Sequence, residues 1–190
     1  MRTSSLRLLQ DPTVVVLAAG HGGSDSGAVN LPHKERDQAI AIVDQTADLL
    51  RSQGIEVEIA PHSEDTEKSI QWVNRNFGFG DAWVLEVHRD SASGLSSDDA
   101  SRRCGIYYGT SESSKDVGKF VRNAYILNGA HPNSWARPDT ASRFGRLGWI
   151  RQTRPVAHLL ELGFMQGKND DAHLSWLAKI ASAVIFDAFT

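Results

Sequence analysis

The sequence lacks several features that would assign it to a functional class at once. Its 190 residues contain a single cysteine, Cys104, which excludes an internal disulfide framework. With 20 basic and 23 acidic residues the net charge is −3, which disfavours a nucleic-acid partner. No apolar run approaches the ~20 residues that span a bilayer, and residues 1–12 lack the apolar stretch of a signal peptide. We therefore expect a soluble single domain with no membrane partner and no export signal.

Nucleotide-binding and serine-hydrolase motifs are also missing. The glycine-rich segment 20–27 (GHGGSDSG) has Asp25 where a dinucleotide fingerprint needs glycine. A phosphate-binding P-loop needs Lys and then Ser or Thr after this segment, but Ala28 and Val29 follow. No Gly-x-Ser-x-Gly elbow is present. What the glycines can do is let the backbone bend closely around His21.

The chain does contain an alternation of apolar strands and amphipathic helices. Apolar or alternating runs predict strands at residues 13–18, 55–60, 82–87, 105–108 and 156–162. Helical periodicity predicts helices over 35–53, from a cap at Thr66, around 117–124, and from Asp170 and Asp171 to the C-terminal region. Residues 89–104 are expected to form a surface loop, and residues 130–150 an irregular loop that contains a helical turn. This alternation predicts an α/β fold with helices on both faces of a largely parallel sheet.

Three ionisable residues lie at equivalent positions in this pattern. His21 follows the first strand, His88 ends the third, and Glu161 lies near the end of the last. Because open α/β sheets bind ligands at the carboxyl ends of their strands, these side chains could converge at one edge. Glu35 begins the first long helix and could join them through the loop after His21. Two imidazoles and a carboxylate form a known zinc-ligand set, and the remaining carboxylate would be free for acid–base chemistry.

Each of these residues also has a simpler structural interpretation. A lone histidine after a strand is more often a hydrogen-bonded structural residue, and Glu35 suits the first turn of any helix. Glu161 is harder to dismiss because it lies in an apolar run, where a buried carboxylate needs a partner or a raised pKa. Glu86 lies two residues before His88, on the same face of the strand, and could orient that histidine.

Four segments match, in order, the motifs of one enzyme family. Residues 20–28 (GHGGSDSGA) match its opening motif, and Glu35 stands where that family places an acidic ligand. His88 stands at the second histidine ligand, and residues 155–164 (PVAHLLELGF) match the closing Leu-x-Glu-x-Gly-Phe motif. Together the segments span most of the chain. On these residues the chain resembles the zinc-dependent N-acetylmuramoyl-L-alanine amidases of the Amidase_3 family.

The resemblance implies an expected site, fold and activity. His21, Glu35 and His88 would bind one zinc ion, and Glu161 would be the catalytic acid–base. Residues 1–190 would form a single catalytic domain with a mixed, mostly parallel central sheet flanked by helices on both faces. The substrate would be peptidoglycan, cut at the amide between N-acetylmuramic acid and L-alanine. A phage endolysin, cytoplasmic until released at lysis and then acting on the cell wall, is one setting that fits.

Other interpretations stay open at this point. The chain departs from the family motifs after His88, where Arg89 and Asp90 follow, and after Phe164. Five arginines in residues 137–154 could bind carboxylates of the peptide stem or belong to a solvated loop. The same ligand set would serve a zinc peptidase that cuts within the stem peptide. A non-catalytic wall-binding module is a third possibility, although it would have no need of a catalytic glutamate.

Overall fold

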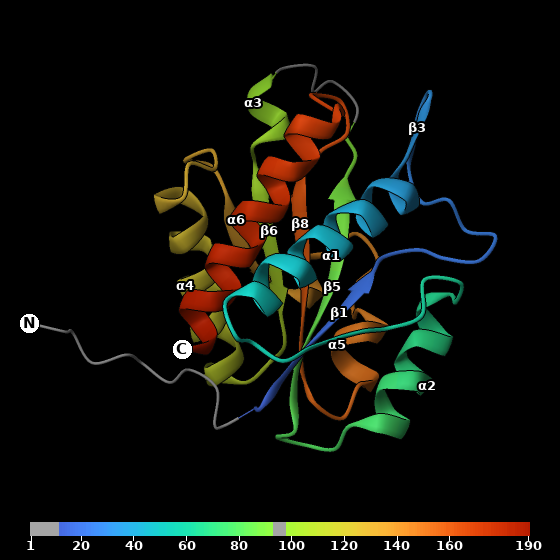
Figure 1. The fold of residues 1–190 in the computed structure, drawn as a ribbon, viewed down its shortest axis with the longest axis vertical. Coiled ribbons are helices and arrows are strands. Elements are labelled where there is room, and N and C mark those ends of the chain that lie inside the picture. Colours follow the sequence, from blue (N-terminus) through green and yellow to red (C-terminus); the bar gives the residue numbers. More distant parts are fainter. Residues whose placement is uncertain (1–11, 93–97) are drawn as a thin grey trace, which may run out of the picture.

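The computed structural model describes residues 12–92 and 98–190, in which a six-stranded sheet lies between two layers of helices (Figure 1). The sheet strands are β1 (Val14–Ala19), β4 (Val57–Ile59), β5 (Ala82–Asp90), β6 (Cys104–Tyr108), β7 (Trp135–Pro138) and β8 (Val156–Phe164). The α-helices are α1 (Glu35–Ser52), α2 (Thr66–Asn76), α3 (Asp98–Ser101), α4 (Glu112–Leu127), α5 (Gly148–Gln152) and α6 (Asp171–Phe189). A 3-10 turn, η1 (Asp139–Ala141), and a separate pair of short strands, β2 (Val29–Asn30) and β3 (His33–Lys34), complete the described elements.

The sheet is mixed and mostly parallel, as predicted. Its strand order is β4-β1-β5-β8-β6-β7, and every neighbouring pair is parallel except β6 and β8. The carboxyl ends of β1, β5 and β8 therefore meet at one edge. In the register of this edge, His88 on β5 lies beside Glu161 on β8.

The two faces of the sheet are covered unequally. Helices α1, α4 and α6 cover one face over a large apolar core that includes Leu17, Leu85 and Ile106. On the other face, the smaller helices α2 and α5 pack over a second apolar cluster that includes Val16 and Val84. This second cluster uses the first residues of β5 and β8, so it leaves the carboxyl-terminal part of that face to polar side chains.

Helix α6 is long and apolar enough to cross a membrane, by length and composition alone. The expectation that no stretch reaches this length was therefore wrong. Of its apolar window, 56% is buried inside the molecule, and α6 packs against α1 and α4 (Figure 1). Burial of this kind is typical of a core helix. Residues 1–11, which the prediction of no signal peptide concerns, lie outside the described part of the chain.

Two predicted loops contain regular structure. Residues 130–150 contain the expected helical turn, as η1 and the start of α5, and in addition the strand β7, which pairs in parallel with β6. In residues 89–104, β5 continues to Asp90 and α3 begins at Asp98, whereas residues 93–97 lie outside the described part. Arg89 in this segment is fully buried instead of exposed.

The N-cap of α2 is Asp65 and not Thr66, the residue that the sequence had predicted. The side chain of Asp65, in extended conformation, accepts a hydrogen bond from the backbone N–H of Lys68 at 2.9 Å. Thr66 is the first helical residue, and its hydroxyl donates to Glu86 Oε1 at 3.2 Å. The start of α2 is thereby tied to the polar end of β5.

Candidate active site

Close approach of ring to backbone explains the glycines around His21. After β1 the chain turns through His21, whose φ is 66°, and Gly20 N–H donates to Val87 O at 2.7 Å. A Cβ atom on Gly20 would overlap the imidazole ring of His88, and one on Gly27 would overlap the ring of His21. Glycine at these two positions therefore makes room for both imidazoles.

His21, Glu35 and His88 come together at the carboxyl edge of the sheet. Glu35 Oε2 lies 3.2 Å from His21 Nε2, and Glu35 Oε1 lies 2.9 Å from His88 Nδ1. One donor atom from each of the three residues lies within 4.8 Å of the others. Glu35 is buried, and its Oε2 also accepts from Ala28 N–H at 2.9 Å. The three donor atoms are close enough together to hold one metal ion.

A carboxylate oxygen lies close to the outer nitrogen of each histidine. His21 Nδ1 lies 2.7 Å from Asp25 Oδ2, and His88 Nε2 lies 3.1 Å from Glu86 Oε2. Carboxylates in this position set the tautomer and orientation of metal-binding histidines. The placement of Glu86 on the face of His88 agrees with the sequence interpretation. Asp25 was missed, although its position in the glycine-rich segment, four residues after His21, is the signal that could have found it.

The pKa shifts of His21, Glu35 and His88 all favour the charged form of each group, so the cluster stabilises positive charge next to the Glu35 carboxylate. Burial opposes ionisation of Glu35, but the hydrogen bonds and charges of the two histidines outweigh it and lower its pKa far below the ordinary value. Burial likewise opposes protonation of His88, and Glu86 and Glu35 outweigh it, so its pKa rises well above the ordinary value. The pKa of His21 is raised as well, with Glu35 outweighing burial. A divalent cation would replace these protons between the same donors, so the residues present fit such a group.

Glu161 lies beside the cluster but outside its donor set. It neighbours His88 in the parallel register of β5 and β8. Its Oε2 atom is shielded from solvent and has no hydrogen-bond partner among the described residues. Burial raises the pKa of Glu161 well above its ordinary value, although the charge of His88 opposes the rise. All four predicted residues therefore meet at one edge, and the Oε2 atom of Glu161 has no hydrogen-bond partner among the described residues.

The departure from the family motif at Arg89 has a structural account. The buried guanidinium donates to Gln38 Oε1 at 3.0 Å, to Phe164 O at 3.1 Å and to Lys168 O at 3.2 Å. The backbone N–H of Arg89 donates to Glu35 Oε1 at 3.2 Å. Arg89 thus links the start of α1 to the segment after β8, where the second departure lies.

The arginine-rich segment divides into two groups. Arg151 forms a two-pronged ion pair with the buried carboxylate of Asp139, and Arg154 donates to the backbone oxygen of Asn74. These two hold η1 and α5 in place. The other three arginines of the segment are Arg137, Arg143 and Arg146. None of them has an ion-pair partner within residues 12–92 and 98–190.

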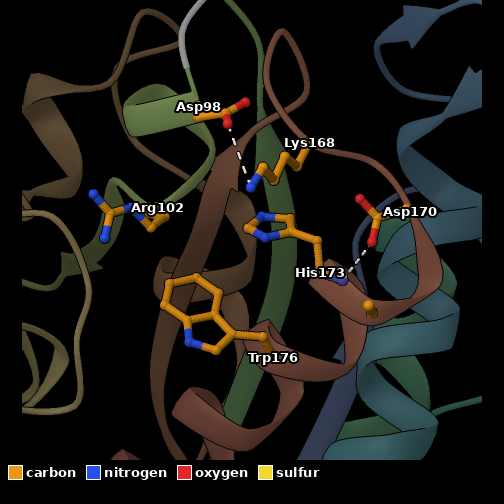
Figure 2. Close-up of a pocket in the computed structure, with 7 residues that line it drawn as sticks. Asp98, Arg102, Lys168, Asp170, His173 and Trp176 are labelled. Atoms are coloured by element: carbon orange, nitrogen blue, oxygen red, sulfur yellow. Dashed lines mark hydrogen bonds and ion pairs between the residues drawn. The ribbon is translucent and has the colours of Figure 1, made fainter.

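A separate cavity of about 320 Å³ lies between α3 and the beginning of α6 (Figure 2). It is lined by Asp98, Arg102, Lys168, Asp170, Ala172, His173 and Trp176. Its charges are largely satisfied internally, since Lys168 pairs with Asp98 at 3.3 Å and Asp170 accepts from the His173 N–H at 3.0 Å. None of the four candidate residues lines it, so the chemistry predicted from the sequence belongs to the other site.

Comparison with known proteins finds a matching family model and several related proteins. The family model described as N-acetylmuramoyl-L-alanine amidase matches residues 15–185. A probable cell wall amidase LytH from Staphylococcus saprophyticus is 30% identical over 166 residues, covering 86% of this chain and 51% of that protein. LytH from Staphylococcus epidermidis is 29% identical over 164 residues, with 85% and 51% covered. The chain spans about half the length of the curated relatives it matches.

Solved structures share the fold. The catalytic domain of CwlV, an N-acetylmuramoyl-L-alanine amidase from Bacillus (Paenibacillus) polymyxa, has a TM-score of 0.71 at 21% identity, covering 91% of this chain and 96% of that one. The catalytic domain of the CD27L endolysin, which targets Clostridia difficile, has a TM-score of 0.67 at 19% identity, with 93% and 96% covered. Cwp6 from Clostridium difficile has a TM-score of 0.73 at 18% identity, covering 94% of this chain and 30% of that one. At these identities the likeness establishes the architecture alone.

Proposed function

Because this chain belongs to the N-acetylmuramoyl-L-alanine amidase family, we propose that it hydrolyses the amide between N-acetylmuramic acid and L-alanine in peptidoglycan. The observation that carries the proposal is the cluster of His21, Glu35 and His88, whose donor atoms lie within 4.8 Å of one another. We propose that this cluster binds one Zn²⁺ ion. Two imidazoles and one carboxylate leave a fourth position open, which is the donor set of catalytic zinc sites.

In this proposal each residue of the site has a defined task. A zinc ion in the cluster would polarise the scissile carbonyl and lower the pKa of a water molecule toward ~7. Asp25 holds the outer ring nitrogen of His21, and the carboxylate of Glu86 lies 3.1 Å from the outer ring nitrogen of His88, an arrangement that would turn the inner nitrogens toward the ion.

Glu161 moves the protons of the reaction. Its unpartnered Oε2 accepts a proton from the attacking water and delivers it to the nitrogen of the departing L-alanine. Burial raises the pKa of Glu161 well above its ordinary value, so its carboxyl group holds a proton more readily than an exposed glutamate and can pass it on. Its position beside His88 supports the assignment.

The setting of the reaction is proposed from the relatives. Curated relatives are named cell wall amidases, and one structural neighbour is an endolysin catalytic domain. We propose that residues 1–190 act as a single catalytic domain on the cell wall, with peptidoglycan as the partner. Release from the cytoplasm at lysis is the route that an endolysin would use.

Digestion of purified peptidoglycan, with and without a chelator, tests the activity. We expect free stem peptides beginning with L-alanine beside intact glycan strands, and no release after chelation, by mass spectrometry. Cleavage within the stem would transfer the assignment to a peptidase at the same site. No release by protein shown to hold zinc would support a wall-binding module instead.

Two variants separate the proposed roles. Glu161→Gln should keep zinc, measured by metal analysis, but lose about 10²- to 10⁴-fold in kcat because the proton carrier is gone. His21→Ala should lose zinc itself. Glu112→Gln, an exposed change on α4 over the opposite face, serves as the control with unchanged zinc content and turnover. Normal turnover by Glu161→Gln would refute the role of Glu161.

A further inference from the structure

Aromatic side chains continue from Glu161 across the part of the sheet face that α2 and α5 leave uncovered. In the strand register, Glu161 on β8 pairs with Gly105 on β6, and Gly105 pairs with Trp135 on β7. Residues in one such row point to the same face of a sheet. Gly105 has no side chain, and a Cβ atom there would overlap the indole of Trp135. The indole therefore lies over the backbone of Gly105, on the face that carries Glu161.

The next row on this face adds a phenol and a cation. Tyr107 on β6 pairs with Arg137 on β7, two residues from the previous row and therefore on the same face. The rings of Tyr107 and Trp135 meet edge to face with centroids 4.6 Å apart. The guanidinium carbon of Arg137 lies 4.8 Å from the centroid of the Trp135 ring. With strands spaced about 4.8 Å apart, this group stands roughly 10 Å across the sheet from Glu161.

The guanidinium of Arg137 is held in place without an acidic partner. Arg137 is exposed, and within residues 12–92 and 98–190 no carboxylate lies within ion-pair distance of its guanidinium. A cation stacked on an aromatic ring and unpaired is prepared to bind a carboxylate from outside the protein.

We propose that Trp135, Tyr107 and Arg137 form the binding subsite for the peptide stem, on the departing side of the scissile amide. The two rings contact the stem, and the guanidinium fork of Arg137 binds the carboxylate on the residue that follows L-alanine. The inference rests on the proposed function and adds the group that the enzyme recognises in its substrate. Arg151 and Arg154 have no part in it, because their hydrogen bonds hold the protein's own loops.

A matched pair of synthetic substrates tests the subsite. Both are N-acetylmuramoyl peptides, identical except that the residue after L-alanine carries either a carboxylate or a carboxamide. For the wild type we expect a KM about ten- to a hundredfold lower for the carboxylate form, the range that a charge-assisted hydrogen-bond pair contributes. Arg137→Ala should raise that KM to the carboxamide value and leave kcat nearly unchanged. Arg137→Lys, which keeps the charge but not the fork, should fall between them.

A control and a binding measurement complete the design. Arg75→Ala removes an exposed arginine at the far end of α2 and should leave both KM values as in the wild type. Calorimetry with the stem dipeptide and its amide measures binding without turnover, and we expect the preference for the carboxylate to vanish in Arg137→Ala.

The outcomes distinguish this inference from the proposed function. If the wild type cleaves both substrates with equal KM, or Arg137→Ala leaves the preference intact, the subsite is wrong and the amidase assignment stands. If the zinc-loaded wild type cleaves neither substrate, the proposed function fails. In that case calorimetry still decides the subsite, since equal affinity for dipeptide and amide would overturn it.

Discussion

At the scale of single residues, the candidate site depends on absent side chains as much as on present ones. The ring of His88 occupies the space where a side chain on Gly20 would stand, and the ring of His21 does the same at Gly27. Substitution of either glycine would therefore move a predicted ligand without touching its chemistry. A glycine substitution can therefore test the geometry of the cluster without removing any of its donor atoms.

Gly20→Ala is expected to weaken zinc binding by at least about tenfold while leaving the fold intact. The added methyl group overlaps the imidazole of His88 and displaces it from Glu35, and misplacing a ligand costs metal affinity on this scale. Competition with a chromogenic chelator measures the affinity, and circular dichroism monitors the fold. Gly148→Ala is the matched control, because its nearest neighbour atom lies 3.4 Å away. Wild-type zinc affinity in Gly20→Ala would contradict the explanation.

Single residues also mark where sequence reasoning ends. His21, His88 and Glu161 could be predicted because strand ends are visible in the apolar pattern and parallel strands end at one edge. The pairing of Asp25 with His21 depends on the left-handed turn at φ 66°, which no local pattern specifies. Arg89 reads as a surface residue by type, and only the fold provides the three acceptors that allow its burial.

At the scale of elements, buried polar contacts join strands to helices in the larger core. His158 on β8 is fully buried; its Nδ1 accepts from Trp83 Nε1 on β5 at 3.0 Å, and its Nε2 lies 3.0 Å from Ser114 Oγ on α4. A proton on Nδ1 would face the indole N–H. Burial accordingly lowers the pKa of His158 to about 4.

Because of His158, we expect the free energy of unfolding to decrease in mild acid. Its pKa is lower in the folded state than the ordinary 6.5, so below pH 6.5 the unfolded chain binds a proton that the folded protein does not. The contribution is complete above pH 6.5 and is lost as the pH falls toward 4. Between pH 7.5 and pH 5 the loss in unfolding free energy should be about 2 kcal/mol.

Urea unfolding at the two pH values, compared between wild type and His158→Gln, isolates this effect. The variant should be less stable at both pH values, yet its loss between them should be smaller than that of the wild type by the same amount. Other titrating groups cancel in the difference. Equal losses in the two proteins would show that His158 does not carry the pH dependence.

Element boundaries were predictable where the local sequence contains their cause. The runs that became β1, β5 and β8 are apolar where helices cover both faces of the sheet, so the start and course of each strand can be predicted from the sequence. β7 could not be found in this way, since three of its four residues are only partly buried, Arg137 is exposed, and the strand pairs at the sheet edge. Thr66 and Asp65 are both good capping residues, and the interaction of Thr66 with Glu86 separates their roles.

At the scale of the whole molecule, the unequal helix layers create the site. Three helices bury one face fully, whereas α2 and α5 cover only the part of the other face nearest the strand starts. The part of this face that α2 and α5 leave uncovered carries the cluster, Glu161 and the aromatic side chains on neighbouring strands.

Zinc is expected to stabilise the entire fold, because its three proposed ligands come from segments that only the folded chain brings together. His21 follows β1, Glu35 begins α1 and His88 lies on β5. An ion that binds the folded state alone adds about 4 kcal/mol at a concentration a thousand times its Kd. For a chain of this size that corresponds to a rise in Tm of roughly 8–16 °C.

Differential scanning calorimetry with and without zinc measures this rise, and two variants show which residues cause it. His21→Ala removes a donor and should abolish the rise, whereas Glu161→Gln lies outside the donor set and should keep it. A common rise in all three proteins would mean that zinc binds elsewhere on the surface. If Tm rises in the wild type and in Glu161→Gln but not in His21→Ala, the metal site is distinct from the proton carrier. His21→Ala then loses the stabilisation by zinc, whereas Glu161→Gln loses only turnover.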